Sequence, residues 1–128
     1  MGQSFKDLHV WQKSIELTEA VYRLSAKFPT NEQFGLTSQM RRASVSVASN
    51  IAEGYGRSTK GEYYQFLGHA RGSLSELETQ LIIARRLGFA EPRTSDSADS
   101  LCADVGRLLA ALLRSIRPIR PSSASASP

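Results

Sequence analysis

The chain has 128 residues and a formal net charge of +4 at pH 7, and each successive quarter of it holds one more Lys or Arg than Asp and Glu combined. This length predicts one domain with a core large enough to fold without disulfides, and the even spread of charge does not by itself mark a nucleic-acid-binding patch. The single cysteine, Cys102, the lack of a signal-like N-terminus and the absence of a long apolar run together predict a cytoplasmic protein that does not enter a membrane.

The first predicted helix begins near His9. One face of it carries Val10, Ser14, Leu17, Val21, Leu24 and Phe28, which recur at spacings of three or four, and Trp11, Ile15 and Tyr22 lie beside this stripe. We expect it to end at Phe28-Pro29, because the residue before a proline is pushed out of helical geometry. The short connection over residues 29–35 predicts that the next helix packs antiparallel to the first.

The second predicted helix occupies most of the stretch 39–57, is expected to end around Gly54-Tyr55-Gly56 because two glycines so close suit a C-terminal cap, and has three different faces. An apolar face carries Leu36, Met40, Ala43, Val47 and Ile51. A polar face carries Arg42, Ser46, Ser49, Asn50, Glu53 and Arg57. The third face carries Arg41, Val45, Ala48 and Ala52. Because such a helix can contact several neighbours at once, we expect it to lie inside an assembly.

The third predicted helix begins at Thr59, which with Glu62 has the spacing of a capping box. Its apolar stripe is the most regular in the sequence and comprises Tyr63, Phe66, Leu67, Ala70, Leu74, Leu77, Leu81 and Ala84. Gly88 is expected to end it, since glycine commonly follows the last helical residue.

The fourth predicted helix follows Pro92, with Thr94, Ser95 and Asp96 as candidate N-caps. Its predicted stripe comprises Leu101, Val105, Leu108, Leu112 and Ile116, widened by Leu109 and Leu113. Four helices with short connections predict an all-α, antiparallel up-down-up-down four-helix bundle over residues 1–116. Residues 117–128 are rich in proline and serine and are expected to form a flexible tail.

The sequence carries no recognisable catalytic or cofactor-binding pattern. Lys6 and Phe66 stand three residues before His9 and His69, where a di-iron bundle would carry glutamates. One cysteine and two distant histidines give no zinc spacing, and Gly54-Tyr55-Gly56 has no preceding strand for a phosphate loop. We therefore expect no metal, no cofactor and no enzymatic activity.

Two groups of candidate functional residues remain. Small residues in the middle helices favour close packing of helices or of subunits, and the candidate interface residues are Val45, Ala48, Asn50, Ala52 and Glu53. The candidate nucleic-acid-binding residues are Arg41, Arg42, Arg57 and Lys60. Glu53 and Arg57 could equally form an ordinary i,i+4 ion pair on the helix surface.

Several motifs recur in order along the chain and together resemble one known family. They are Leu8-x-Val10-Trp11-Gln12-Lys13, Phe28-Pro29, Phe34-Gly35-Leu36, Gln39-Met40-Arg41-Arg42-Ala43 and Ser49-Asn50-Ile51-Ala52-Glu53-Gly54-Tyr55. With further matches up to about residue 90, the sequence resembles the four-helix-bundle family associated with intervening sequences of bacterial 23S ribosomal RNA, whose members are also called S23 ribosomal proteins.

The resemblance implies a cytoplasmic bacterial protein that assembles as a ring-like homopentamer. It also implies a relationship to accessory proteins of the reverse transcriptases of diversity-generating retroelements, which bind nucleic acid through basic surface. The leading hypothesis is a non-enzymatic homo-oligomer that binds RNA, a ribonucleoprotein or a reverse transcriptase. The alternative is an oligomeric protein–protein scaffold that does not bind nucleic acid.

Overall fold

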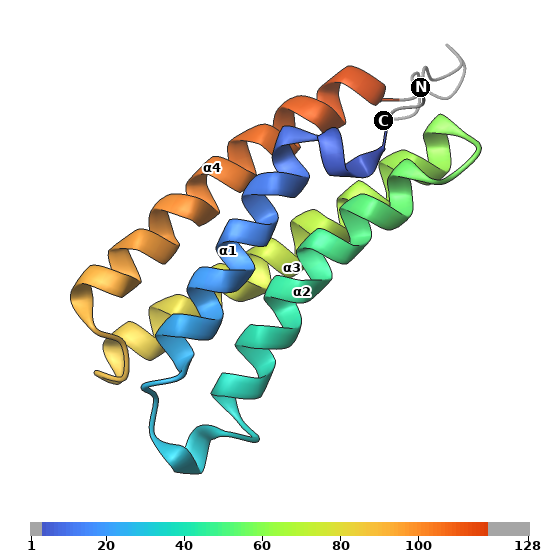
Figure 1. The fold of residues 1–128 in the computed structure, drawn as a ribbon. Coiled ribbons are helices and arrows are strands. Elements are labelled where there is room, and N and C mark those ends of the chain that lie inside the picture. Colours follow the sequence, from blue (N-terminus) through green and yellow to red (C-terminus); the bar gives the residue numbers. More distant parts are fainter. Residues whose placement is uncertain (1–3, 118–128) are drawn as a thin grey trace, which may run out of the picture.

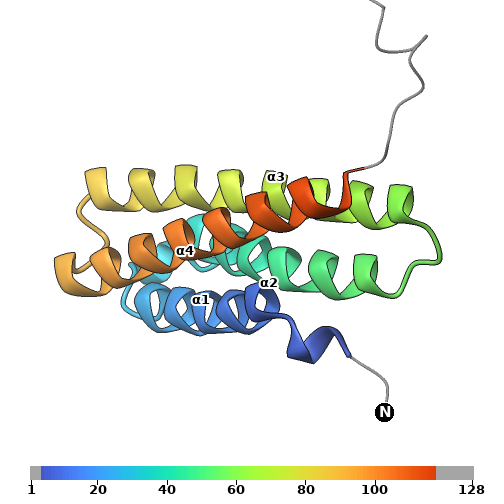
Figure 2. The ribbon, with the colours of Figure 1, turned by 90° about the horizontal axis from the view of Figure 1, so that it is seen from above.

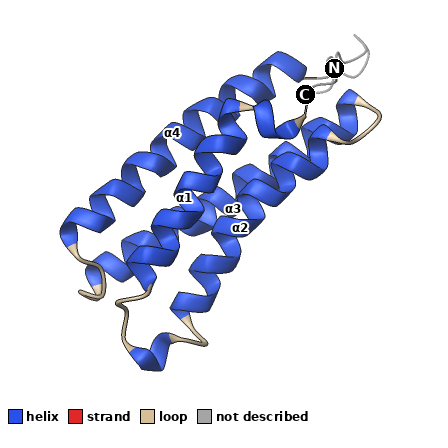
Figure 3. Cartoon of the chain, in the orientation of Figure 1, coloured by secondary structure: helices blue, strands red, loops and turns tan. Residues whose placement is uncertain are grey.

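The computed structural model describes residues 4–117, and within this range it contains helices and loops but no strand (Figure 3). Four long helices follow one another: α1 (His9–Ser25), α2 (Leu36–Tyr55), α3 (Lys60–Arg86) and α4 (Pro92–Ile116). Two short 3-10 helices, η1 (Phe5–Asp7) and η2 (Thr30–Glu32), precede α1 and α2. The all-α four-helix prediction is confirmed.

The helices form a closed up-down-up-down bundle. Each helix packs against two others, α1 against α2 and α4, and α3 against α2 and α4. The α1–α2 and α3–α4 connections lie at one end of the bundle and the α2–α3 connection lies at the other (Figure 1). Viewed from above, α4 crosses the bundle at a slant and η1 extends beyond the start of α1 (Figure 2).

The core is built from the apolar faces that the sequence predicts for the first three helices. Its largest fully buried side chains include Leu17 and Val21 of α1, Met40 and Ile51 of α2, and Leu77 of α3. Because these residues recur every three or four positions, each helix buries one continuous stripe against its neighbours. Leu36, Tyr63 and Phe66 of the predicted stripes are only half-buried.

The fourth helix departs from its prediction in two ways. It begins at Pro92, with Glu91 as the N-cap, so the expected N-caps Thr94, Ser95 and Asp96 lie inside its first turns. Proline suits the first helical position because the amide hydrogen it lacks would have no intrahelical partner there. The buried stripe is also rotated: Ser95, Ala98, Cys102, Val105, Leu109 and Leu113 face inward, whereas the predicted Leu101, Leu108, Leu112 and Ile116 are half-buried flanks.

The helix ends are set by local hydrogen bonds. α1 ends at Ser25, earlier than predicted, because the amides of Lys27 and Phe28 donate to carbonyls three residues back and tighten the chain into turns. Phe28 nevertheless remains buried. Gly88 adopts a φ of 76° after α3, and the Phe89 amide donates to the Ala84 carbonyl at 2.9 Å, as in a Schellman motif.

Two further expectations concern the tail and the membrane. The tail predicted for residues 117–128 lies, apart from Arg117, outside the described residues. None of the described helices has both the length and the apolar character that crossing a membrane requires.

Candidate interface and nucleic-acid-binding residues

Arg41 is held by contacts within the bundle. Its Nε–H donates to the Ser25 hydroxyl at 2.8 Å and its Nη2 donates to the Tyr22 carbonyl at 3.3 Å, so it links α2 to α1. Its guanidinium carbon also lies 4.6 Å from the centroid of the Tyr22 ring, a cation–π distance. Arg42, the next residue in the sequence, is exposed. The two adjacent arginines therefore have different surroundings.

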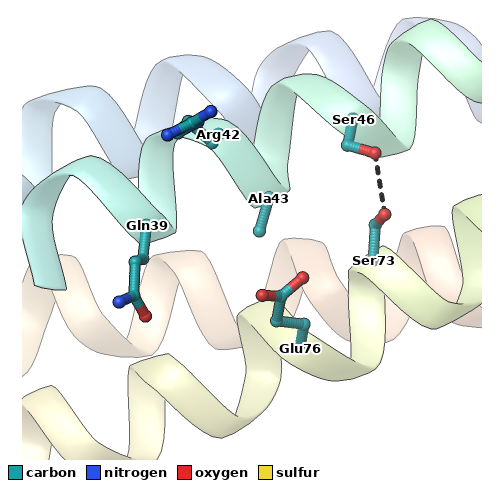
Figure 4. A pocket seen from close by; sticks show the side chains of 6 residues that line it. All are labelled: Gln39, Arg42, Ala43, Ser46, Ser73 and Glu76. Atoms are coloured by element: carbon teal, nitrogen blue, oxygen red, sulfur yellow. Dashed lines mark hydrogen bonds between the residues drawn. The ribbon is translucent and has the colours of Figure 1, made fainter.

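Arg42 borders a polar pocket of about 440 Å³ between α2 and α3. Ser46 and Ser73 meet across this pocket with their hydroxyl oxygens 2.8 Å apart, and Glu76 extends from α3 toward Ala43 (Figure 4). The Glu76 carboxylate would repel a phosphate at this place. This pocket therefore suits a neutral or cationic group better than an anion.

Arg57 lies in the connection that follows α2, and Lys60 is the first residue of α3. Both are exposed. Arg57 pairs with Glu53 at 2.8 Å, as the i,i+4 spacing predicts, and its guanidinium carbon lies 4.5 Å from the centroid of the Phe66 ring. The ion pair has both partners in solvent, where such a pair contributes little to stability.

The five candidate interface residues divide between two faces of α2. Val45, Ala48 and Ala52 line an apolar groove of about 300 Å³, whose opposite wall comes from Trp11 of α1 and Phe5 of η1. The rings of Phe5 and Trp11 pack edge to face, with centroids 5.2 Å apart. Three of the five residues thus share one apolar surface that includes aromatic side chains.

Asn50 and Glu53 lie outside this groove. The Asn50 amide donates to the Ser46 carbonyl at 2.8 Å and to the Ser46 hydroxyl at 3.0 Å. Glu53 is occupied by Arg57. Both belong to the polar face of α2. His69 of α3 is exposed and packs edge to face on Phe66 of the same helix.

Full or partial burial shifts the pKa of two titratable groups in the described part of the chain. Burial raises the pKa of the Cys102 thiol to about 12, with smaller contributions from Glu78 and Asp99. Burial also raises the pKa of Tyr63, and nearby Tyr55 adds to the effect. Among residues 4–117, no three His, Cys, Asp or Glu side chains are grouped so that they could hold a metal ion.

Another pocket, of about 310 Å³, lies where α1 connects to α2. Tyr22, Phe34, Arg41 and Arg42 contribute to its walls, and Phe34 is 91% exposed. Sequence reasoning used Phe34 only as part of a motif and placed Tyr22 beside a helix stripe. The available signal was a large aromatic residue in a short polar connection that precedes two arginines.

Comparison with known proteins relates this fold to solved and classified relatives. The family model described as 23S rRNA-intervening sequence protein matches residues 6–111. The chain is also similar to the crystal structure of a protein with unknown function from the S23 ribosomal protein family of Bacteroides thetaiotaomicron VPI-5482, with 24% sequence identity and a TM-score of 0.74. The match covers 82% of this chain and 95% of that chain. Comparison with curated proteins found no match.

Proposed function

The chain belongs to the 23S rRNA-intervening sequence protein family, and from this premise we propose that it is a non-enzymatic, self-associating bundle that binds RNA or a ribonucleoprotein. Phosphate groups of the RNA would be contacted by basic side chains on the surface of the bundle. The assembly expected from the sequence resemblance is a ring-like homopentamer.

The observation that carries the RNA proposal is the exposure of Arg42, Arg57 and Lys60. Exposed arginine and lysine side chains can replace the counterions of a phosphate backbone, which is the main source of affinity in such complexes. Arg41 supports the bundle through Ser25 and Tyr22. We therefore assign the phosphate contacts to the three exposed residues.

Self-association is supported by the apolar groove between α1 and α2. Its lining includes Trp11, Ile15 and Val45, and Val45 is 42% exposed in the single chain. Aromatic and aliphatic residues gathered in this way are typical of the buried centre of a protein interface. A second copy of the chain would remove this apolar surface from water.

The RNA proposal is tested by measuring RNA affinity over a series of salt concentrations. For the triple variant Arg42→Ala/Arg57→Ala/Lys60→Ala, we expect weaker binding and a shallower dependence of log K on log salt, by about one for each phosphate that the protein no longer neutralises. The control is Arg107→Ala, because Arg107 is exposed and pairs with Asp104 much as Arg57 pairs with Glu53. If the wild-type protein does not bind RNA at low salt, only the scaffold alternative remains.

The assembly is tested by light scattering of the wild type and of Val45→Glu. A carboxylate in the groove should reduce the assembled mass, because burying an unpaired charge is costly. Ile82→Glu, on an exposed apolar side chain of α3, is the control. A wild-type mass equal to the 14.0 kDa chain would overturn self-association.

The non-enzymatic assignment has a separate test. A reproducible catalytic turnover that is lost in Glu53→Ala, while this variant remains folded, would overturn it.

A further inference from the structure

We propose that the pocket at the α1–α2 connection binds one unpaired nucleotide of RNA, with its base stacked on Phe34 and its phosphate at Arg42. This inference rests on the proposed RNA-binding function and names the part of the RNA that the bundle recognises. Proteins that read single-stranded RNA commonly stack its bases on aromatic side chains and on arginine planes.

The first support is the exposure of two aromatic side chains in one pocket. Phe34 is 91% exposed and Tyr22 is 43% exposed, and both line the same cavity. Phe34 lies between η2 and α2, where its ring adds little to the core. An aromatic ring that is exposed to this extent is free to stack on a planar ligand.

The second support is the fixed orientation of Arg41. Its hydrogen bonds to Ser25 and to the Tyr22 carbonyl hold the guanidinium beside the Tyr22 ring. A guanidinium that is already fixed loses little conformational freedom when a ligand binds. Arg41 therefore provides a prepared planar surface inside the pocket.

The third support is the distribution of charge around Arg42. On one side, Arg42 borders the pocket that contains Glu76. On the other side it borders the pocket of Phe34, whose lining residues, all in the described part of the chain, include no acidic residue. The carboxylate of nearby Glu32 accepts a hydrogen bond from the Leu36 amide at the start of α2. A phosphate is thus favoured on the Phe34 side of Arg42.

The remaining lining groups suit the edge of a base. Gln33 carries an amide, which can both donate and accept, and Ser38 carries a hydroxyl. The volume of about 310 Å³ is at the lower end of the roughly 300–1,000 Å³ that small-ligand pockets occupy. A single nucleotide therefore fits this pocket better than a longer ligand does.

The test compares two RNAs, a hairpin with an unpaired uridine loop and a blunt duplex with the same stem. For Phe34→Ala we expect hairpin binding to weaken by at least about fivefold, the lower limit for loss of one base–aromatic stack, with an unchanged salt dependence. Phe34→Tyr should restore the affinity. Arg42→Ala should instead make the salt dependence shallower by about one. Leu87→Ala, which removes an exposed apolar side chain from the α3–α4 connection, is the control.

A second measurement locates the base directly. A hairpin with 5-iodouridine in its loop should cross-link to residue 34 on irradiation, and mass spectrometry of the peptides identifies the site. Hairpin binding that is unaffected by Phe34→Ala, while Arg42→Ala still weakens it, would overturn this inference and leave the RNA proposal standing. Loss of assembled mass in Phe34→Ala without loss of RNA affinity would assign Phe34 to a protein contact instead. If wild-type protein bound neither RNA, both proposals would fall.

Discussion

Gly54 of α2 approaches Phe66 of α3 so closely that a Cβ atom on Gly54 would lie 2.8 Å from the Cβ of Phe66. The same atom would lie 3.1 Å from Cδ1 of Tyr63. Gly54 is also buried, although it occupies the last turn of α2. The close packing of α2 against α3 at this end of the bundle therefore depends on a position without a side chain.

We expect Gly54→Ala to lower the free energy of unfolding, because overpacking a core usually costs about 1–3 kcal/mol. The gain of up to about 1 kcal/mol from better helix propensity should offset only part of this cost. Gly68→Ala is the matched control, because no atom of a neighbour lies within 4 Å of its added Cβ. Urea unfolding of both variants measures the difference, and equal stabilisation by both would contradict the packing argument.

Arg41 and Arg42 should differ in their effects on stability. Arg41→Ala removes the hydrogen bond to Ser25 and the contact with the Tyr22 ring, and we expect a loss of about 1–3 kcal/mol. Arg42→Ala changes an exposed side chain and should stay within about 0.5 kcal/mol of wild type. Thermal or urea unfolding distinguishes the two. Similar midpoints would show that the links from Arg41 to α1 contribute little.

Gly88 should resist replacement because of its backbone rather than its surroundings. Its φ of 76° is strained for residues with a Cβ, although no neighbouring atom lies within 4 Å of the added Cβ. We expect Gly88→Ala to cost about 1–2 kcal/mol and Gly88→Asn to cost less, because asparagine tolerates this conformation better. The comparison of the two unfolding midpoints is the test. A milder effect of alanine than of asparagine would contradict it.

Cys102 should make stability depend on pH in the alkaline range. Burial raises the pKa of its thiol from 9.0 to about 12, so the folded chain holds this proton more tightly than the unfolded chain does. The resulting contribution to the free energy of unfolding totals about 2–4 kcal/mol. It is complete below about pH 9 and is lost as pH rises toward 12. We expect Cys102→Ala to lose less stability over this range than wild type. Parallel stability curves would rule the effect out.

Hydrophobic spacing predicts the first three helices because their buried positions are occupied by large apolar residues such as Leu17, Met40 and Leu77. In α4 the inward positions include Ser95, Ala98 and Cys102, which are small and contribute little to a hydrophobic pattern in the sequence. Because Leu101 and Leu108 are more hydrophobic, the predicted stripe was centred on them instead of on the buried positions. The start of α4 was also predicted too late, because Pro92, its first residue, was interpreted as a break before the helix.

The candidate site was predictable only in part. Sequence spacing placed Val45, Ala48 and Ala52 on one face, and they line one groove in the structure. The different surroundings of Arg41 and Arg42 were not visible, because they depend on where Tyr22 and Ser25 of another helix lie. Contacts between helices are fixed by the packing of the whole bundle, which a single sequence does not display.

The order of contacts around the bundle also bears on how the chain folds. Among the described residues, three of the four helix pairs in contact are consecutive in sequence, and only the pairing of α1 with α4 joins distant parts of the chain. Contacts between neighbours close short loops and form at low entropic cost. Refolding should therefore be fast, with α1 docking on α4 late. Folding kinetics test this through φ-values, the ratio of a substitution's effect on the folding barrier to its effect on stability. A low φ-value for Val105→Ala in α4 and a high one for Val47→Ala in α2 would show this sequence of events.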